Sequence, residues 1–154
     1  MKEKIIILTT FFFLFTKVFA QGKIETNVGI GFMEALSLKV KYGKKIQIGI
    51  GQGFAGKYIF QSSMEFYYHL GNKNEQIKRK SAYLMVGVGS TFLSQGYNDQ
   101  ITTFYPRYGV AISLSKRTGI NLDIGPILIL IKDTDGSSNW LPFISGSVHY
   151  YFKI

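Results

Sequence analysis

Residues 82–92 read AYLMVGVGSTF, and this stretch indicates the fold class more directly than any other. Bulky apolar residues alternate in it with glycine and other residues, so the two faces of an extended chain differ. The first face carries Ala82, Leu84, Val86, Val88 and Phe92. The second face carries Tyr83, Met85, Gly87, Gly89 and Thr91. Such a period of two is the signature of a β-strand that lies between two environments.

The same alternation recurs along the chain in eight segments. They span residues 24–32, 36–42, 46–54, 60–70, 82–92, 104–114, 120–130 and 144–154. A strand that crosses a membrane needs about 9–11 residues, and eight strands make the smallest common membrane barrel. We therefore predict an all-β fold, namely an eight-stranded antiparallel up-and-down transmembrane β-barrel.

The composition of the two faces predicts which one points outward. One face of nearly every segment is bulky and apolar, whereas the other is rich in Gly, Ser, Asn and Gln. Glycine weakens a strand and covers nothing, so it suits a solvated surface poorly. It suits the inside of an eight-stranded barrel, which is only wide enough for side chains. We expect Ile48 and Val86 to touch lipid, and Gly49 and Gly87 to face the lumen.

The composition limits the kinds of site that the chain can hold. Its 154 residues are enough for one domain, and the absence of cysteine excludes disulfides and thiolate metal sites. Only 18% of the residues are charged, whereas 16% are aromatic, which is typical of an all-β chain of this kind. The formal net charge is +9, but the basic residues lie in separate turns without interleaved aromatics. A nucleic-acid partner is therefore not expected.

The N-terminal residues have the features of a secretory signal peptide. Two lysines precede an apolar run at 5–15, and Val18 and Ala20 satisfy the small-x-small rule for cleavage. The apolar run is shorter than the roughly 20 residues of a transmembrane helix. We predict a signal peptide at 1–20 and a barrel domain at 21–154. An uncleaved anchor helix is the alternative interpretation.

A barrel with a periplasmic N-terminus divides its connections into two sets. Periplasmic turns, which hold most of the surplus basic residues, are expected near 43–45, 71–80 and 115–118. External loops are expected near 33–35, 55–58, 93–102 and 132–140. We expect outer-membrane lipid around the barrel, and an extracellular partner would bind through loops 93–102 and 132–140. Charged turns are usually only solvated, so the turns by themselves predict no anion site.

Aromatic residues gather near the ends of the segments. At the periplasmic rim we expect Tyr42, Tyr68, Tyr150 and Phe152. At the opposite rim we expect Phe32, Phe54, Phe60, Phe92, Phe104 and Trp140. Two such girdles are typical of a membrane barrel.

The predicted lumen contains many ionisable residues. Those expected to form one network are Glu25, Lys39, Lys41, Glu65, Arg107, Asp123, His149 and Lys153. Glu25 neighbours Lys39 and Lys41 on the second segment and, if the barrel closes, His149 and Lys153 on the eighth. Buried charges must be paired to be tolerated, so we interpret the set as a structural ion network. A proton or ion path is the alternative.

Neither histidine lies in an evident catalytic motif. His69 and His149 are both expected to point inward near the periplasmic end, and neither stands beside a serine with a facing carboxylate. The acidic residues and histidines are too scattered for a metal site. We therefore predict a non-enzymatic barrel without metal or cofactor. The alternatives are a lipid-modifying enzyme on the same fold and a soluble periplasmic barrel that binds an apolar ligand inside.

Three prolines interrupt the predicted strands. Pro106 and Pro142 are expected near the outer rim, where strands begin, and Pro126 predicts a bulge. The run at 127–131 is apolar on both faces. It predicts either a dry plug or a small apolar pocket.

The chain resembles the small outer-membrane β-barrel proteins of the OmpA/OmpX type. The resemblance covers 21–154 and rests on the signal peptide, the eight alternating segments and the closing sequence SVHYYFKI at 147–154. In that family the last strand ends in an aromatic residue that the barrel-assembly machinery reads, whereas here Ile154 is last and Phe152 lies two positions before it. The resemblance implies insertion by that machinery into the outer membrane of a Gram-negative bacterium. It also implies a structural or surface-interaction role.

Overall fold

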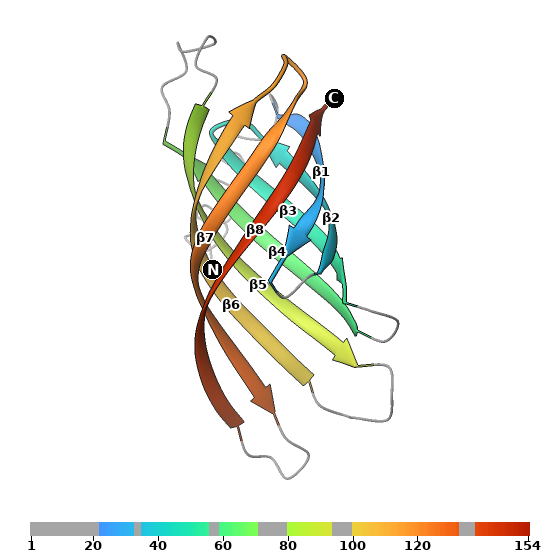
Figure 1. Ribbon diagram of the computed structural model, residues 1–154, viewed down its shortest axis with the longest axis vertical. Coiled ribbons are helices and arrows are strands. Elements are labelled where there is room, and N and C mark those ends of the chain that lie inside the picture. The colour runs from blue at the N-terminus through green and yellow to red at the C-terminus, as the bar shows by residue number, and fades with distance from the viewer. Residues whose placement is uncertain (1–21, 33–34, 56–58, 71–79, 94–99, 133–137) are drawn as a thin grey trace, which may run out of the picture.

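Eight β-strands make up the fold (Figure 1). The computed structural model describes residues 22–32, 35–55, 59–70, 80–93, 100–132 and 138–154. The strands are β1 (Lys23–Gly31), β2 (Leu36–Gly43), β3 (Ile46–Phe54), β4 (Ile59–His69), β5 (Lys80–Leu93), β6 (Gln100–Ser113), β7 (Thr118–Lys132) and β8 (Ser138–Lys153). Among the described residues, no helix is long and apolar enough to cross a membrane.

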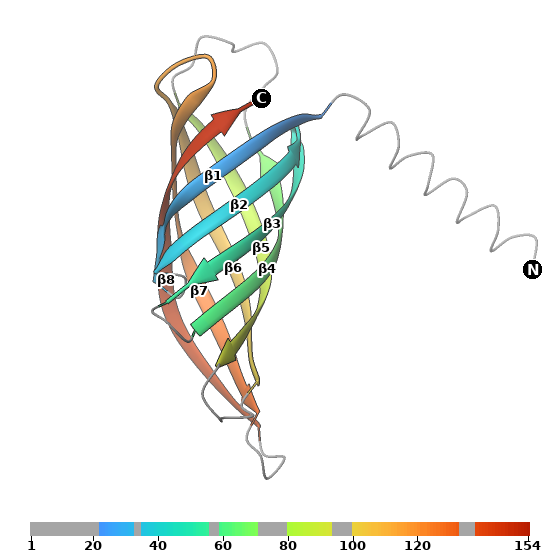
Figure 2. The ribbon, with the colours of Figure 1, turned by 90° about the vertical axis from the view of Figure 1, so that its right-hand side faces the viewer.

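The strands close into a barrel. Each strand pairs antiparallel with the next along the chain, and β8 pairs back onto β1. Figure 2 shows the tilt of the strands around the tube. The predicted all-β, eight-stranded, antiparallel up-and-down barrel is thereby confirmed as a fold.

Two tight turns lie at one end of the barrel. We call this the terminal end because Ile154 lies there. Only two residues separate β2 from β3, and Gly43 adopts a φ of 132° before them. A Cβ on Gly43 would lie 2.0 Å from the carbonyl oxygen of Ile46, so the turn requires glycine. In the β6–β7 turn, the hydroxyl oxygen of Ser115 accepts hydrogen bonds from the backbone N–H groups of Arg117 and Thr118, both at 3.1 Å.

The opposite end, here called the far end, is uneven. The first four strands have 8 to 11 residues, whereas β5 to β8 have 14 to 16. The long strands therefore continue past the short ones (Figure 1). The external loops expected at 93–102 and 132–140 are correspondingly shorter, because β6 already begins at Gln100 and β8 at Ser138. The remainder of these loops, like the expected signal peptide at 1–20, lies outside the described residues.

The two faces of the strands have the orientation that the sequence predicts. Val86 exposes 42% of its surface, whereas Gly87 beside it is buried. Ile48 and Ile112 are half-buried on the outer side, and Gly49 is buried on the inner side. Every strand carries at least one exposed large apolar residue. The buried interior is mostly polar, so the molecule is inverted relative to a water-soluble domain.

Two of the three predictions about prolines were wrong. Pro126 forms no bulge, because β7 pairs with β8 without interruption and keeps one register with β6 on both sides of a short gap in pairing. Pro106 lies in the middle of β6 instead of at the rim, and the shared register puts it opposite Pro126. Proline has no backbone N–H group. Because two prolines face each other here, neither strand has a backbone N–H at this position that lacks a hydrogen-bond acceptor. Pro142 lies near the far end, as expected.

Candidate functional site

The eight residues of the predicted ion network all lie on the inner face of the barrel. Seven of them are buried, and the side chain of Lys153 is 36% exposed near the terminal end. Their contacts centre on three carboxylates, those of Glu25, Glu65 and Asp123. The predicted pairings hold for some of these residues and not for others.

Glu25 on β1 pairs with two of its four predicted neighbours. Its carboxylate lies 3.3 Å from Lys41 Nζ on β2 and 3.8 Å from Lys153 Nζ on β8. The amide of Asn121 on β7 donates to the same carboxylate at 3.2 Å. Lys41 also lies over the ring of Tyr67, 4.2 Å from its centroid, which adds a cation–π contact.

Lys39 reaches a different carboxylate from the one expected. Its Nζ donates to Glu65 Oε1 on β4 at 2.7 Å, although β3 runs between the two strands. Tyr105 on β6 donates to the same oxygen at 3.0 Å, and the hydroxyl of Tyr67 donates to the other carboxylate oxygen. Glu65 is thus the centre of a buried cluster that joins β2, β4 and β6.

Arg107 and Asp123 form the centre of the second cluster. Arg107 Nη1 lies 2.9 Å from Asp123 Oδ1, and Arg107 Nη2 donates to Ser145 at 2.9 Å. Ser147 donates to Asp123 at 2.8 Å, and the hydroxyl of Tyr83 donates to it at 3.2 Å. Charge-assisted hydrogen bonds of this kind are the strong ones, and here they join β5, β6, β7 and β8.

His149 lies beside two serines, one of which also contacts a carboxylate, whereas we expected neither histidine to stand beside a serine with a facing carboxylate. Its Nε2 is 2.7 Å from Ser37 Oγ on β2, and its Nδ1 is 3.1 Å from Ser147 Oγ. Because Ser147 also contacts Asp123, the side chains form a chain from a serine through a histidine to a carboxylate. Ser37 has 0% exposed surface.

His69, the second histidine, contacts the Arg107–Asp123 cluster only through the ring of Tyr83. Its Nε2 lies 2.9 Å from Gln47 Oε1, and its ring lies against the ring of Tyr83, with 5.6 Å between the centroids. Within the described ranges, no group of three His, Asp or Glu residues has a spacing that could hold a metal ion.

A common geometry connects many of these contacts, and we call it the glycine brace. Two polar side chains on alternate strands meet above a glycine on the strand between them. The glycine is directly opposite both partners in the register, so its missing side chain leaves the space in which they meet. Four sets follow this rule: Ser37–Gly29–His149, Glu65–Gly87–Tyr105, Tyr83–Gly109–Asp123 and Ser113–Gly119–Tyr151.

The fit between each glycine and its neighbours is close. A Cβ on Gly87 would lie 2.2 Å from the ring of Tyr105, and one on Gly109 would lie 2.1 Å from the ring of Tyr83. These distances are shorter than any van der Waals contact, so a side chain would displace the ring that carries the hydroxyl. The glycines are therefore required by the packing of the lumen and not only by its width.

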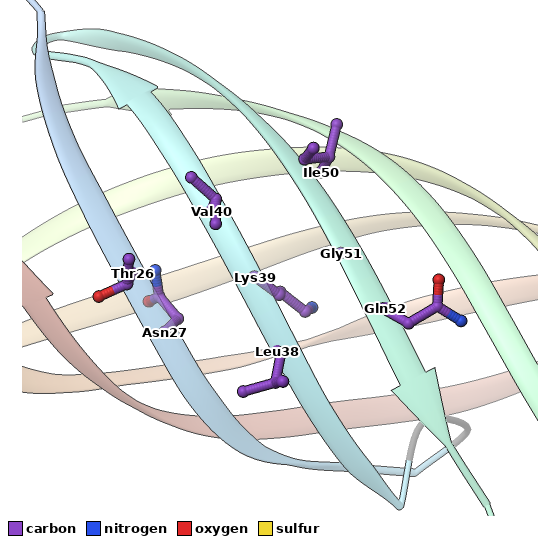
Figure 3. Close-up of a pocket in the computed structure, with 8 residues that line it drawn as sticks. All are labelled: Thr26, Asn27, Leu38, Lys39, Val40, Ile50, Gly51 and Gln52. Carbon is purple, nitrogen blue, oxygen red and sulfur yellow. The ribbon is translucent and has the colours of Figure 1, made fainter.

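The outer wall contains a shallow groove across β1, β2 and β3 (Figure 3). It has a volume of about 440 Å³ and is lined largely by apolar surface of Leu38, Val40 and Ile50. Thr26 and Gln52 add polar atoms, and Gln52 accepts a hydrogen bond from Ser62 at 3.0 Å. The described outer face at this groove carries no exposed charged side chain.

The inward tyrosines and serines of the braces were not among the predicted network residues. The signal was present, because Tyr83, Tyr105 and Tyr151 occupy the polar face of their segments. Each of them lies opposite a glycine in a neighbouring strand. Only the register between strands, which the sequence alone does not provide, turns this pattern into named pairs.

Comparison with known proteins supports the fold. No model of a known protein family matches the chain. No curated protein matches it either. Among solved structures, the chain is similar to the N-terminal β-barrel domain of Pseudomonas aeruginosa OprF, with a TM-score of 0.56 and 14% sequence identity. The match covers 86% of this chain and 100% of that one, so the two share a barrel fold across nearly the whole described chain.

Proposed function

We propose that the chain is an integral outer-membrane β-barrel with a filled lumen and a structural or surface-interaction role. One observation carries the proposal, namely that the exposed residues of all eight strands include large apolar side chains while the charged side chains of the strand interiors are buried inside. An apolar surface that surrounds a whole barrel is far larger than the patches that soluble monomers expose. Lipid is the solvent that such a surface fits.

The lumen supports a barrier and not a wide channel. Both clusters and the glycine braces cross it, and Tyr83, Tyr105 and Tyr151 are each only 1% exposed. Eight strands leave room for side chains alone. We infer that the braces fix the strand register and hold the wall rigid. We also infer export through the signal peptide at 1–20 and insertion by the barrel-assembly machinery.

Membrane fractionation combined with gel mobility tests this proposal. The full chain, expressed in a Gram-negative host, is expected in the outer-membrane fraction, and it should migrate differently before and after boiling because a folded barrel resists detergent. Recovery in the aqueous fraction without detergent would instead favour the soluble periplasmic barrel. The buried polar side chains of the lumen weigh against an apolar ligand inside it.

A second candidate function is a lipid-modifying enzyme on the same barrel. The chain of contacts from Ser37 through His149 to Ser147 and Asp123 favours it, because a nucleophile beside a histidine is the arrangement of serine hydrolases. The complete burial of Ser37 weighs against it, since no substrate reaches a fully covered hydroxyl. Incubation of the folded barrel with a fluorescent fluorophosphonate separates the two. We expect no labelling, and labelling that Ser37→Ala abolishes would favour the enzyme.

A further inference from the structure

Among the side chains whose exposure the structure describes, the exposed charge lies at one end of the barrel. Within this described set, the exposed charged residues are Lys23, Lys44, Lys45, Lys80, Lys116 and Arg117. All six lie at the terminal end, at the starts of β1 and β5 and in the β2–β3 and β6–β7 turns. We call this set the basic collar.

The carboxylates have the opposite distribution. Glu25, Glu65 and Asp123, the described acidic residues, are all buried in the lumen, where each contacts a lysine or arginine. The acidic side chains that the structure describes thus lie inside the barrel, whereas the collar lies on its rim. Solvated turns in most proteins mix both signs of charge, whereas the exposed charged side chains described at this end are all basic.

The collar lies next to exposed apolar side chains. Lys45 Nζ is 5.3 Å from the centroid of the Tyr68 ring, whose surface is partly exposed. Leu114 precedes the β6–β7 turn and Ile154 ends the chain, and both are largely exposed. Lysines and tyrosines at such a boundary keep their polar ends in the headgroup layer and their apolar parts in hydrocarbon.

We propose that the basic collar binds the headgroups of anionic phospholipids in the leaflet at the terminal end. This inference rests on the proposed membrane insertion. The charges come from four separate points around the rim, as lipid headgroups surround a barrel on all sides. A soluble polyanion would instead match a patch or stripe on one face. Basic residues near a membrane surface each attract anionic lipid, and the attraction weakens with salt.

Electron spin resonance of labelled lipids tests the collar directly. The full-length folded barrel is reconstituted in phosphatidylcholine vesicles that contain a trace of spin-labelled phosphatidylglycerol or spin-labelled phosphatidylcholine. The immobilised fraction of each label reports its affinity for the protein surface. We expect phosphatidylglycerol to be preferred about threefold or more at low salt, with the preference falling as salt is added.

A charge-removing variant and two controls locate the effect. The quadruple variant Lys44→Gln, Lys45→Gln, Lys116→Gln and Arg117→Gln should lose at least about half of the preference. A matched variant that exchanges lysine and arginine at the same four positions should keep it. Lys132→Gln removes one positive charge at the end of β7 on the far side and should also leave the preference intact.

Insertion is measured separately, by flotation with pure phosphatidylcholine vesicles and by mobility before boiling. An inserted barrel with equal affinity for both labels, or with a preference that the quadruple variant retains, overturns the collar and leaves the membrane proposal standing. A chain that does not float with vesicles overturns the membrane proposal and the collar with it.

Discussion

Side chains fill the interior of the barrel differently near its two ends. Near the terminal end the inner face is polar, and glycines alternate with the residues that meet above them. At the far end, Ile127 and Ile129 are buried with Ile101 and Ile131 packed against them. The residues at 126–131 include no glycine.

This difference shows what each type of filling requires. At the four braces, the polar side chains of alternate strands meet in the gap that a glycine leaves in the strand between them. Branched apolar side chains fill space by contact with whatever is adjacent, so they need no gap and no fixed partner. The polar part should therefore be sensitive to single changes in chemistry, and the apolar part mainly to changes in volume.

The largest expected effect is the loss of a charged centre in the polar part. Glu65→Ala removes the carboxylate that contacts Lys39, Tyr67 and Tyr105. We expect a decrease of about 3–5 kcal/mol in the free energy of unfolding, because breaking a buried ion pair leaves a charge without compensation. Urea titration measures this decrease when the folded form is followed by its gel mobility before boiling. Glu65→Gln removes the charge but keeps the shape, so it should lose less than Glu65→Ala; no loss at all in Glu65→Gln would mean that the charge itself contributes nothing.

A volume change in the apolar part should be somewhat smaller in effect. Ile127 has 0% exposed surface, so Ile127→Ala leaves a cavity and should lower the free energy of unfolding by about 2–4 kcal/mol. Ile127→Val, which removes one methylene, should lose about 1 kcal/mol. If both variants unfold at the wild-type urea concentration, the far end is not a packed region.

Addition of one methyl group tests the glycine brace itself. Gly109→Ala forces the ring of Tyr83 away from Asp123 and should destabilise the barrel by about 1–3 kcal/mol. Gly49→Ala is the matched comparison, because its Cβ would lie 3.2 Å from the flexible chain of Lys41 and 3.3 Å from the ring of Tyr67. A loss as large for Gly49→Ala as for Gly109→Ala would contradict the brace.

The smallest expected effect is at the edge of the polar part. Lys153 is 3.8 Å from Glu25 and its side chain is partly exposed, so Lys153→Gln should change the free energy of unfolding by less than about 1 kcal/mol. Lys41→Gln, at the buried partner of the same carboxylate, should cost clearly more. Thermal or urea unfolding of the two variants side by side gives the ranking.

Much of this architecture follows from the sequence, because a period of two assigns each residue to a face without any knowledge of pairing. The alternation of Tyr83, Leu84 and Met85 already assigns the tyrosine and the methionine to the lumen and the leucine to the outside. The register between strands has no such local signal. Lys39 was expected at Glu25 and is found at Glu65, because long side chains cross a neighbouring strand wherever glycines leave room.

The missed serine–histidine contact and the mistaken bulge have the same origin. Ser37 and His149 lie on β2 and β8, which become near neighbours only when the barrel closes through β1. Pro126 reads as a defect along its own strand, and its meaning emerges only when Pro106 is found across from it. Local sequence predicts faces, whereas closure and register determine partners.

Spin labels on β5 test the central claim, which is that the apolar face lies in hydrocarbon and the polar face is sealed inside. The chain has no cysteine, so single cysteines at Leu84, Met85 and Val86 can each carry one label in the vesicle-bound protein. We expect labels at Leu84 and Val86 to collide with oxygen dissolved in the bilayer, and the label at Met85 to be shielded from both oxygen and a water-soluble nickel chelate. Strong collision with the nickel chelate at Leu84 and Val86 would show an apolar face in water and would contradict the account.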